Sequence, residues 1–337
     1  MCLLRYLLYP LSLIYFFITF LKNFLYEINL LKSTSFDLPT IGIGNLSFGG
    51  TGKTPMSEYI IENFNKSFEL AFLSRGYKRS TNGFILASEN STVEQIGDEP
   101  FQIIKKFKNI KVAVDADRSN GVKKLIKDFP KIEGIILDDV FQHRSIDLKL
   151  SILLTTYRKP FYNDHIAPVG TLRESSSGSK RADIIIVTKC PIDLKEESKI
   201  KIAQKIKLKN NQDLFFSSIE YDDKLLGRDQ IEIGQILKRK VLLITGIADS
   251  TPIVDHLKRK KIVFSHISFG DHHFYDRSDY QRISKEFKNY LILTTEKDFY
   301  KISKLGLKND IYYFKIKIKF LDSENRFKKI IESNLTN

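Results

Sequence analysis

The segment Ser47-Phe-Gly-Gly-Thr-Gly-Lys-Thr54 contains the residue types that hold the phosphates of a nucleoside triphosphate. Glycines let backbone N–H groups converge on phosphate oxygens, Lys53 adds a positive charge, and Thr54 can bind Mg²⁺ through its hydroxyl. The usual pattern begins with a glycine where this chain has Ser47, so the strict pattern is not met. We predict a triphosphate site rather than a glycine-rich turn that merely starts a helix, with the expected contacts Ser47, Phe48, Gly49, Gly50, Thr51, Gly52, Lys53 and Thr54.

Two pairs of acidic residues could complete such a site. Asp138-Asp139 end an apolar run that starts at Gly134, and carboxylates at strand ends reach the metal ion opposite a triphosphate loop. We therefore predict that they bind Mg²⁺, although paired aspartates are often only a solvated turn. Asp98 and Glu99 could act as a general base or lie near the metal. Taken locally, they are more simply acids at the start of a helix.

Two further segments carry polar groups suited to chemistry. In Asp271-His-His-Phe-Tyr275, neighbouring side chains of a strand would point to opposite faces, so both histidines would rarely serve one metal. A loop with one working histidine is more plausible, and two surface histidines are the alternative. Gly170-Thr-Leu-Arg-Glu174 could face a substrate or phosphate, but an ordinary solvated loop is the simpler interpretation.

Short apolar runs alternate with helical patterns and would position these motifs. Expected helices are Lys53–Asn63, Glu94–Phe107 and Arg118–Phe129. The alternation predicts an α/β fold, with a parallel sheet covered on both faces and ligands bound at the carboxyl ends of its strands. The expected strands are Thr40–Gly44, Leu70–Ser74, Lys111–Val114, Gly134–Leu137, Leu150–Thr155 and Ile184–Thr188.

A second alternation of strands and helices begins near Lys240, after a lysine-rich stretch at 195–209 that is most simply a solvated helix face. Three parts are therefore expected. Residues 1–35 form an apolar segment, 36–210 a domain with the triphosphate loop, and 211–337 a smaller α/β domain with its linker. The strands expected in this last region are Leu214–Ile219, Val241–Thr245, Ile262–Ile267, Leu291–Thr295 and Ile311–Ile316.

The composition fits a globular protein with an anionic partner. The chain has 337 residues, 42% of them hydrophobic and 28% charged, and a formal net charge of +14. No RNA-recognition, zinc-finger or helix-turn-helix pattern is present, so nucleic acid is not expected as a partner. With only Cys2 and Cys190, a disulfide framework is improbable and a four-thiolate metal site is impossible.

The N-terminal sequence is sharply more apolar than the rest. Between Arg5 and Lys22 lie the uncharged residues 6–21, fewer than the roughly 20 that span a bilayer upright. Tyrosines, phenylalanines and flanking basic residues suit the interface between water and membrane. We predict membrane association, by shallow insertion or by a full span. A signal peptide is disfavoured because no small-residue cleavage site follows, and an ordinary buried helix is the other alternative.

Taken together, these segments resemble the tetraacyldisaccharide 4′-kinase family of lipid A biosynthesis. A serine or threonine at the position of Ser47 is usual in that family. Two positions depart from its pattern, because Val140 stands where glycine is usual and Ser175 where proline is usual. The resemblance covers nearly the whole chain through Pro10–Tyr15, Gly44–Pro55, Leu73–Tyr77, Gly97–Pro100, Asp138-Asp139, Phe141–Arg144, Leu172–Glu174, Asp271–His273 and Thr295–Asp298.

The resemblance implies a two-domain kinase with an N-terminal membrane helix. It would transfer the γ-phosphoryl group of ATP to the 4′-hydroxyl of an acylated glucosamine disaccharide 1-phosphate, at the cytoplasmic face of the inner membrane. Asp98 would be the catalytic base, paired with a histidine for which we favour His272 over His273. Lys53 and Thr54 would serve ATP and Mg²⁺. Asp138, Asp139 and Glu174 would be metal ligands or lie beside the metal.

Two rival interpretations remain. A GTPase or metallochaperone-like switch protein would read guanine through an Asn/Thr-Lys-x-Asp loop, but Val187-Thr-Lys-Cys-Pro191 has proline where that aspartate is needed. The other rival is a membrane scaffold with a vestigial nucleotide site. The intact Lys53, Thr54 and acidic residues argue against it.

Overall fold

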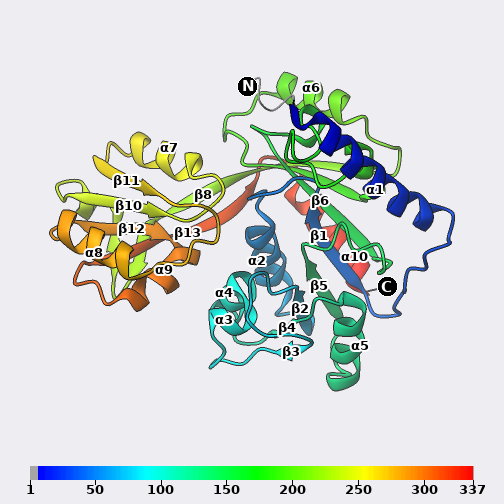
Figure 1. Cartoon of the computed structure of the whole chain (residues 1–337), viewed down its shortest axis with the longest axis horizontal. Coiled ribbons are helices and arrows are strands. Elements are labelled where there is room, and N and C mark those ends of the chain that lie inside the picture. Colours follow the sequence, from blue (N-terminus) through cyan, green and yellow to red (C-terminus); the bar gives the residue numbers. More distant parts are fainter. Residues whose placement is uncertain (1–6, 337) are drawn as a thin grey trace. The chain divides into compact units, whose positions relative to one another are not determined.

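The computed structural model describes residues 7–336, which form two compact units (Figure 1). The smaller unit comprises Ile219–Lys317, and the larger one comprises the chain before it together with the chain from Ile318 onward. The expected division into 1–35, 36–210 and 211–337 is therefore wrong in two respects. Residues 7–35 belong to the larger unit, and so do residues 318–336.

The larger unit is built on a mostly parallel sheet with β1 (Thr40–Asn45) inside it. Strand β1 pairs in parallel with β5 and β6, so that Ile43 lies beside Asp138 on one side and Ile152 on the other. Strand β3 is antiparallel to its neighbour β4. The strand order is β8, β7, β6, β1, β5, β2, β4 and β3, with the bounds Asp213–Gly227, Ile184–Thr188, Leu150–Thr156, Thr40–Asn45, Gly134–Asp138, Leu70–Ser74, Lys111–Val114 and Ile85–Leu86.

Helices cover both faces of this sheet because successive strand side chains point to opposite faces. In β5, Ile136 packs into one core cluster while Ile135 packs into another. The first cluster also receives side chains of α2 (Lys53–Phe64), α4 (Asp98–Lys106) and α10 (Glu324–Thr336). The opposite face is covered by α5 and α6, with the bounds Arg118–Asp128 and Glu196–Ile206.

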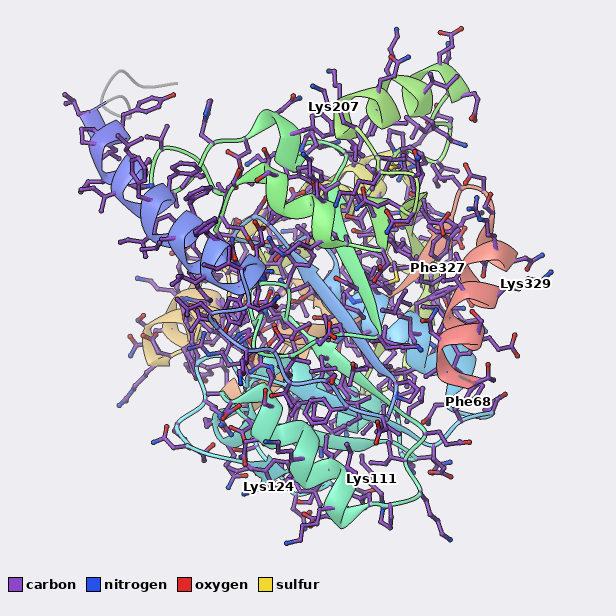
Figure 2. All side chains as sticks on the ribbon, turned by 90° about the vertical axis from the view of Figure 1, so that its right-hand side faces the viewer. Phe68, Lys111, Lys124, Lys207, Phe327 and Lys329 are labelled. Atoms are coloured by element: carbon purple, nitrogen blue, oxygen red, sulfur yellow. The ribbon has the colours of Figure 1, made fainter. Side chains whose placement is uncertain are left out.

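Helix α10 explains why the chain returns to the larger unit. Its residues Phe327, Ile331 and Leu335 are buried with Phe320 in the core cluster beneath α2. Figure 2 shows Phe327 on the inner side of α10 and Lys329 pointing outward. Burial of these apolar side chains on the sheet favours this return.

One expected helix is broken. The segment 94–107 forms α3 (Val93–Ile96) and α4 (Asp98–Lys106), separated by Gly97 with a φ of 88°. This left-handed backbone favours glycine and ends α3 at the point where α4 begins. As a result, Asp98 is the first residue of a new helix instead of lying inside one.

The smaller unit contains its own parallel strands in the order β11, β10, β12 and β13. Its helices α7, α8 and α9 follow β10, β11 and β12 in the chain and span Thr251–Arg259, Arg277–Glu286 and Glu296–Ile302. Strand β9 (Gln230–Glu232) pairs with β8 in an antiparallel manner. The parallel strands have the bounds Phe264–Ser268, Val241–Thr245, Leu291–Thr295 and Ile311–Phe320, and short 3₁₀ turns in the two units span Phe161–Asn163, Ser176–Arg181, Ile233–Ile236 and Ser303–Leu305.

The apolar N-terminal sequence forms α1 (Tyr9–Glu27), which belongs to the larger unit. Within residues 7–336, no helix is long and apolar enough to cross a membrane. Much of α1 is nevertheless exposed, and Ser12 is the residue that it buries. The large apolar side chains that it exposes are Tyr9, Leu11, Leu13, Ile14, Phe17, Ile18, Phe20, Leu21 and Phe24. Cys2, Arg5 and Tyr6 lie outside the described residues.

The lysine-rich stretch at 195–209 forms most of α6, whose buried residues are Ile202 and Ile206. Lys201, Lys205 and Lys207 are exposed, which confirms the solvated helix face. Lys207 projects from the ribbon in Figure 2 together with Lys124 of α5. These lysines contribute to the positive charge without marking a binding site.

Candidate active site

The loop between β1 and α2 has the geometry that its glycines allow. Gly49 and Gly52 adopt φ values of 101° and 94°, a region that side chains other than hydrogen disfavour. Asn45, the last residue of β1, donates from Nδ2 to the Gly49 carbonyl at 3.2 Å and to the Thr51 hydroxyl at 2.9 Å. The loop therefore wraps around a buried asparagine side chain before α2 begins at Lys53.

A second segment anchors the same loop from the side. The Phe48 N–H donates to the Thr171 carbonyl and the Arg173 N–H to the Leu46 carbonyl, both at 2.7 Å. The Thr188 hydroxyl at the end of β7 donates to the Thr51 carbonyl at 2.7 Å. The segment 170–174, which could have been an ordinary solvated loop, is thus paired with the glycine-rich loop.

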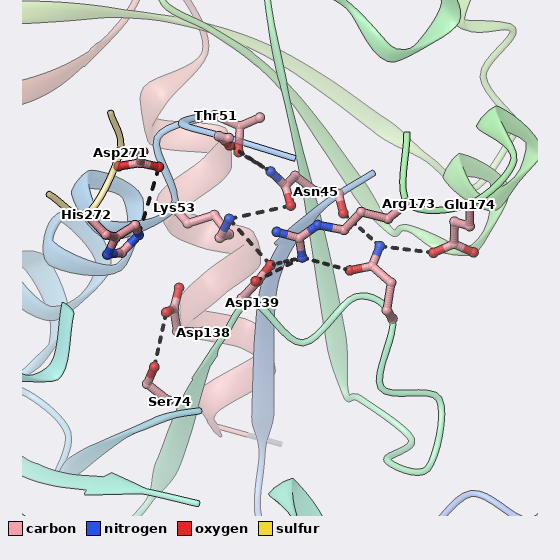
Figure 3. A network of polar contacts seen from close by, with 12 residues as sticks. Asn45, Thr51, Lys53, Ser74, Asp138, Asp139, Arg173, Glu174, Asp271 and His272 are labelled. Atoms are coloured by element: carbon pink, nitrogen blue, oxygen red, sulfur yellow. Dashed lines mark hydrogen bonds and ion pairs between the residues drawn. The ribbon is translucent and has the colours of Figure 1, made fainter. Parts of the chain in front are cut away.

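Lys53 faces the carboxylate that follows β5. Its Nζ lies 3.4 Å from Asp139 Oδ1 and 3.5 Å from Asn45 Oδ1 (Figure 3). Arg173 donates to both oxygens of Asp139, at 2.8 and 2.9 Å. Burial by itself would raise the pKa of Asp139, but the charges of Lys53 and Arg173 hold it below its ordinary value. Asp139 is therefore ionised and fixed in place.

Asp138 has the opposite environment. Its side chain is buried, its Oδ2 accepts a hydrogen bond from the Ser74 hydroxyl at 3.3 Å, and its Oδ1 has no partner in the described structure. Burial raises the pKa of Asp138 to about 7, with Lys53 opposing that rise and the nearby carboxylates of Glu99 and Asp139 adding to it. A buried oxygen without a donor fits a cation that would supply the missing positive charge.

A buried arginine lies behind the two aspartates. Arg118, at the start of α5, donates to the backbone carbonyl of Asp115 at 2.6 Å and to that of Asp138 at 3.3 Å. Burial lowers its pKa to about 10, although the charges of Asp138 and Asp139 favour the charged form. Arg118 therefore supports the end of β5 electrostatically.

The acidic residues expected at or beside the metal have different environments, and Glu174 stands apart from Asp138 and Asp139. In the described part of the chain, no three histidine, cysteine, aspartate or glutamate residues are placed to hold one metal ion. Glu174 instead accepts hydrogen bonds from Asn23, Gln142 and Arg181 at 2.7, 3.0 and 2.9 Å. Its oxygens are taken by hydrogen-bond donors. Asp138, Asp139 and the Thr54 hydroxyl are then the candidate metal ligands.

Asp98 is buried at the first turn of α4. A Cβ atom at Gly97 would lie 3.1 Å from Gly76 and from the Tyr77 carbonyl, so the glycine allows this turn to approach the loop after β2. The next residue, Glu99, acts electrostatically on Asp138. The structure thus brings the Gly97–Pro100 segment, Asp138 and the loop after β2 into one neighbourhood of the larger unit.

The two histidines lie in the smaller unit, after β11, and have different partners. His273 Nε2 lies 2.8 Å from Asp279 Oδ2, and its ring stacks on Phe269 with centroids 4.2 Å apart. His272 has a φ of 58°, and its Nε2 lies 3.1 Å from Lys297 Nζ and 3.9 Å from Asp271 (Figure 3). His273 is therefore held by its surroundings, and the pairing of Asp98 with His272 stays a prediction.

Several residues of this site were not singled out from the sequence. Asn45, Arg173 and Gln142 connect the glycine-rich loop to the acids, and Ser74 and Arg118 contact Asp138. Arg173 and Gln142 lie inside motifs that carried the family resemblance, which was the available signal. Asn45 and Ser74 also lie inside such segments, Gly44–Pro55 and Leu73–Tyr77, whereas Arg118 lies in none of them, because its role depends on how α5 packs against the end of β5.

The parallel sheet, the glycine-rich loop with Lys53 and the acids after β5 define a phosphotransferase of the nucleotide-binding α/β class. The family model described as "Tetraacyldisaccharide-1-P 4'-kinase" matches residues 4–336. The chain belongs to this family, and this finding does not favour the rival GTPase interpretation.

Curated relatives and a solved structure agree with the family match. A tetraacyldisaccharide 4′-kinase of Flavobacterium johnsoniae is 44% identical over 97% of this chain and 96% of its own. A Bacteroides thetaiotaomicron enzyme of the same name is 40% identical over 94% and 89%. The crystal structure of LpxK from Aquifex aeolicus in complex with ATP superposes with a TM-score of 0.77 at 28% identity, covering 99% of this chain and 100% of that one.

Proposed function

We propose that this protein transfers the γ-phosphoryl group of ATP to the 4′-hydroxyl of a tetraacyldisaccharide 1-phosphate in lipid A biosynthesis. One observation carries the proposal beyond the family match. Lys53 of the glycine-rich loop faces the ionised Asp139, and the buried Asp138 beside it keeps an oxygen without a donor. Phosphoryl transfer needs such an arrangement, because it depends on positioning and charge neutralisation.

Mg²⁺ fits this donor set. Asp138 and Asp139 offer the carboxylate oxygens that hard divalent cations prefer, and Thr54 offers a hydroxyl at the start of α2. When bound, the ion would supply positive charge at the β- and γ-phosphates. The loop from Ser47 to Thr54 would hold the phosphates through its backbone N–H groups and Lys53.

The chain's own residues would carry the proton and the charge of the reaction. The 4′-oxygen forms a bond to the γ-phosphorus as the bond to the β,γ-bridging oxygen breaks, and ADP leaves. Asp98 accepts the proton of the 4′-hydroxyl, and His272 orients or assists that carboxylate. Lys53 stabilises the charge that develops on the phosphoryl oxygens. This assignment of roles rests on the family resemblance and on the burial of Asp98 at the start of α4.

The same proposal places the enzyme at the cytoplasmic face of the inner membrane. Helix α1 exposes an apolar surface that includes Leu13, Phe17 and Leu21, and one helix of this kind can lie within the membrane interface. The net charge of +14 would favour an anionic leaflet and a phosphorylated lipid. An acylated acceptor would then be reached without leaving the bilayer.

A labelled-phosphate assay tests the function directly. ATP with a labelled γ-phosphate is incubated with a tetraacyldisaccharide 1-phosphate and the wild type, Asp98→Ala or Lys53→Ala. We expect a 4′-phosphorylated lipid from the wild type and a loss of at least about 10²-fold in both variants. Lys66→Ala, a change in the turn after α2, is the matched control and should keep full activity. ATP hydrolysis without lipid product, or full activity of both variants, would refute the assignment.

A further inference from the structure

A continuous row of hydrogen bonds leads from α1 into the candidate active site. Asn23, in the last two turns of α1, donates from Nδ2 to Glu174 Oε2 at 2.7 Å. Glu174 is only 3% exposed, and its other oxygen accepts from Gln142 Nε2 at 3.0 Å and from Arg181 at 2.9 Å. An exposed apolar helix is thus tied by its polar side to a buried carboxylate.

The row continues from Gln142 to the glycine-rich loop by two routes. Gln142 Oε1 accepts a hydrogen bond from Arg173 at 3.3 Å. Arg173 also donates to Asp139, which forms an ion pair with Lys53. Gln142 Nε2 also donates to the backbone carbonyl of Asn45 at 2.8 Å. Figure 3 shows Glu174, Arg173, Asp139 and Lys53 following one another across the site.

Each member of the row has one orientation that satisfies its neighbours. The Gln142 amide must direct its oxygen to Arg173 and its nitrogen to Glu174, because the reverse would set donors against donors. Glu174 has to be an ionised acceptor for three donors. Buried networks that are fully satisfied fix their members in place, and a change at one end disturbs the other.

Helix α1 is attached to the same segment at further points. Lys22 Nζ donates to the Gln142 carbonyl at 3.1 Å, and Arg144 donates to the Asn23 carbonyl at 2.8 Å while its guanidinium lies 5.2 Å from the centroid of the Tyr26 ring. The segment 142–144 follows Asp138-Asp139 in the chain after Val140 and Phe141. The position of α1 is therefore transmitted to the residues next to the acids.

We propose that Asn23, Glu174 and Gln142 are positioning residues that hold Arg173 against Asp139 and thereby couple the placement of α1 to ATP binding. The inference deepens the proposed function and rests on it, since it takes the Ser47–Thr54 loop as the ATP site and α1 as the part that meets lipid. None of the three residues touches ATP in this proposal. They act through Arg173, Asp139 and the Asn45 carbonyl.

The proposal is tested by exchanging the amide of Asn23 and the carboxylate of Glu174. The exchange shows whether the hydrogen bond between these two positions affects Mg·ATP binding. Asn23→Asp sets two carboxylates within hydrogen-bond distance in a buried place, so we expect about a tenfold weaker dissociation constant for Mg·ATP and a similar fall in kcat. Glu174→Gln should cost only about two- to threefold, because Asn23 can turn its amide to accept from the new donor. In the double variant the donor and acceptor are exchanged, and affinity should return to the level of Glu174→Gln.

The pH dependence of Mg·ATP binding distinguishes a positioning role of Asn23 from a general loss of structure in the variant. Two facing carboxylates share a proton with a raised pKa, so the Mg·ATP affinity of Asn23→Asp relative to wild type should recover as pH falls from 8 towards 6. A structural defect would show no such recovery. Thr19→Ala is the control on the same helix, since the Thr19 hydroxyl bonds only to the Tyr15 and Phe16 carbonyls in the described structure.

Equilibrium binding of Mg·ATP is measured without lipid, so its outcome is independent of the acceptor. Wild-type affinity in Asn23→Asp, or a double variant as weak as Asn23→Asp with a normal melting temperature, would overturn the inference. If the exchange pattern holds while no variant or wild type phosphorylates the lipid, the proposed function fails and the positioning row stands.

Discussion

Each of the two units contains a pair of adjacent identical residues, Asp138-Asp139 in the larger unit and His272-His273 in the smaller. In both pairs the two side chains have different surroundings. In each pair one residue has a left-handed backbone, with φ values of 49° for Asp139 and 58° for His272. A left-handed residue interrupts the regular alternation of side-chain directions along an extended chain, so the two adjacent side chains have different surroundings. Asp139 is bound by Arg173 and His273 by Asp279, while Asp138 keeps one oxygen without a donor in the described structure and His272 lies beside Lys297 and Asp271.

The pairs differ in what holds the fixed member. Asp139 is fixed by charge, through Lys53 and Arg173, and its pKa is lowered. His273 is fixed by one carboxylate and by aromatic rings, with Phe269 stacked at 4.2 Å and Tyr275 edge-on at 4.9 Å. Adjacent identical residues therefore need not share a role, and their environments assign the roles.

The largest effect is expected from removing the charge of Asp138. Asp138→Asn should reduce kcat by about 10²- to 10³-fold, because a buried metal ligand loses its charge. Its melting temperature should stay the same or rise, because an amide is cheaper to bury than a carboxylate. Lipid phosphorylation and thermal unfolding measure the two quantities. Asp139→Asn is the comparison and should lower both activity and stability, since Lys53 and Arg173 lose their shared partner.

The histidine pair is separated by parallel glutamine substitutions. His272→Gln should lower kcat by about 10- to 100-fold with little change in stability, as expected of a group that assists proton transfer. His273→Gln should instead destabilise the protein by about 1–2 kcal/mol through the lost contact with Asp279 and Phe269. Kinetic assays of both variants measure kcat, and denaturant unfolding measures the free energy of unfolding. Together they identify which histidine assists the reaction. The reverse pattern would make His273 the working histidine.

The pKa of Asp138 predicts a pH dependence. In the proposed site the carboxylate form of Asp138 binds the metal, so kcat/KM for Mg·ATP should rise with pH through about 7 and fall roughly tenfold per unit well below it. Without metal, the stability contributed by this group is present at low pH and is lost as pH rises through about 7, because its folded pKa lies above the unfolded one. Excess Mg²⁺ should therefore raise the melting temperature more at pH 8 than at pH 6. An equal rise at both values would contradict a metal site at Asp138.

A smaller effect than those at the aspartates and histidines is expected at Arg173. Arg173→Lys keeps the charge but loses the guanidinium whose Nη1 donates to both oxygens of Asp139, so Mg·ATP affinity should fall by about three- to tenfold. Arg181→Lys, which alters an arginine on Glu174 with no contact to Asp139, is the matched control and should change affinity less. Titration calorimetry of both variants is sufficient. Equal losses of Mg·ATP affinity in the two variants would mean that the contact between Arg173 and Asp139 makes no specific contribution to binding.

Local sequence patterns predicted much of the site. The loop of Ser47–Thr54, the strand that ends at Asp138 and the helix from Lys53 depend on nearby residues, and the structure has each of them where expected. The break at Gly97 was missed because the helical pattern continues on both sides of the glycine. The positive φ of Gly97 became visible only in the packed structure.

Long-range partners explain the remaining errors. The family resemblance implied that Glu174 binds the metal or lies beside it, whereas its hydrogen bonds with Asn23 and Arg181 depend on how α1 and the 3₁₀ turn at 176–181 pack and could not be predicted. The second domain was extended to residue 337 because no composition change marks the return of the chain at Ile318. Neither feature is encoded within a short window of sequence.

The packing of α10 has a consequence for the order of synthesis. Tyr59 of α2 donates to Glu324 at 2.7 Å, and Phe327 completes the core beneath the helix that starts at Lys53. A ribosome must therefore translate the whole smaller unit before the larger unit can finish its core. A nascent chain that ends before Phe327 lacks the side chain that packs beneath α2. We therefore expect no ATP turnover until translation has passed this residue.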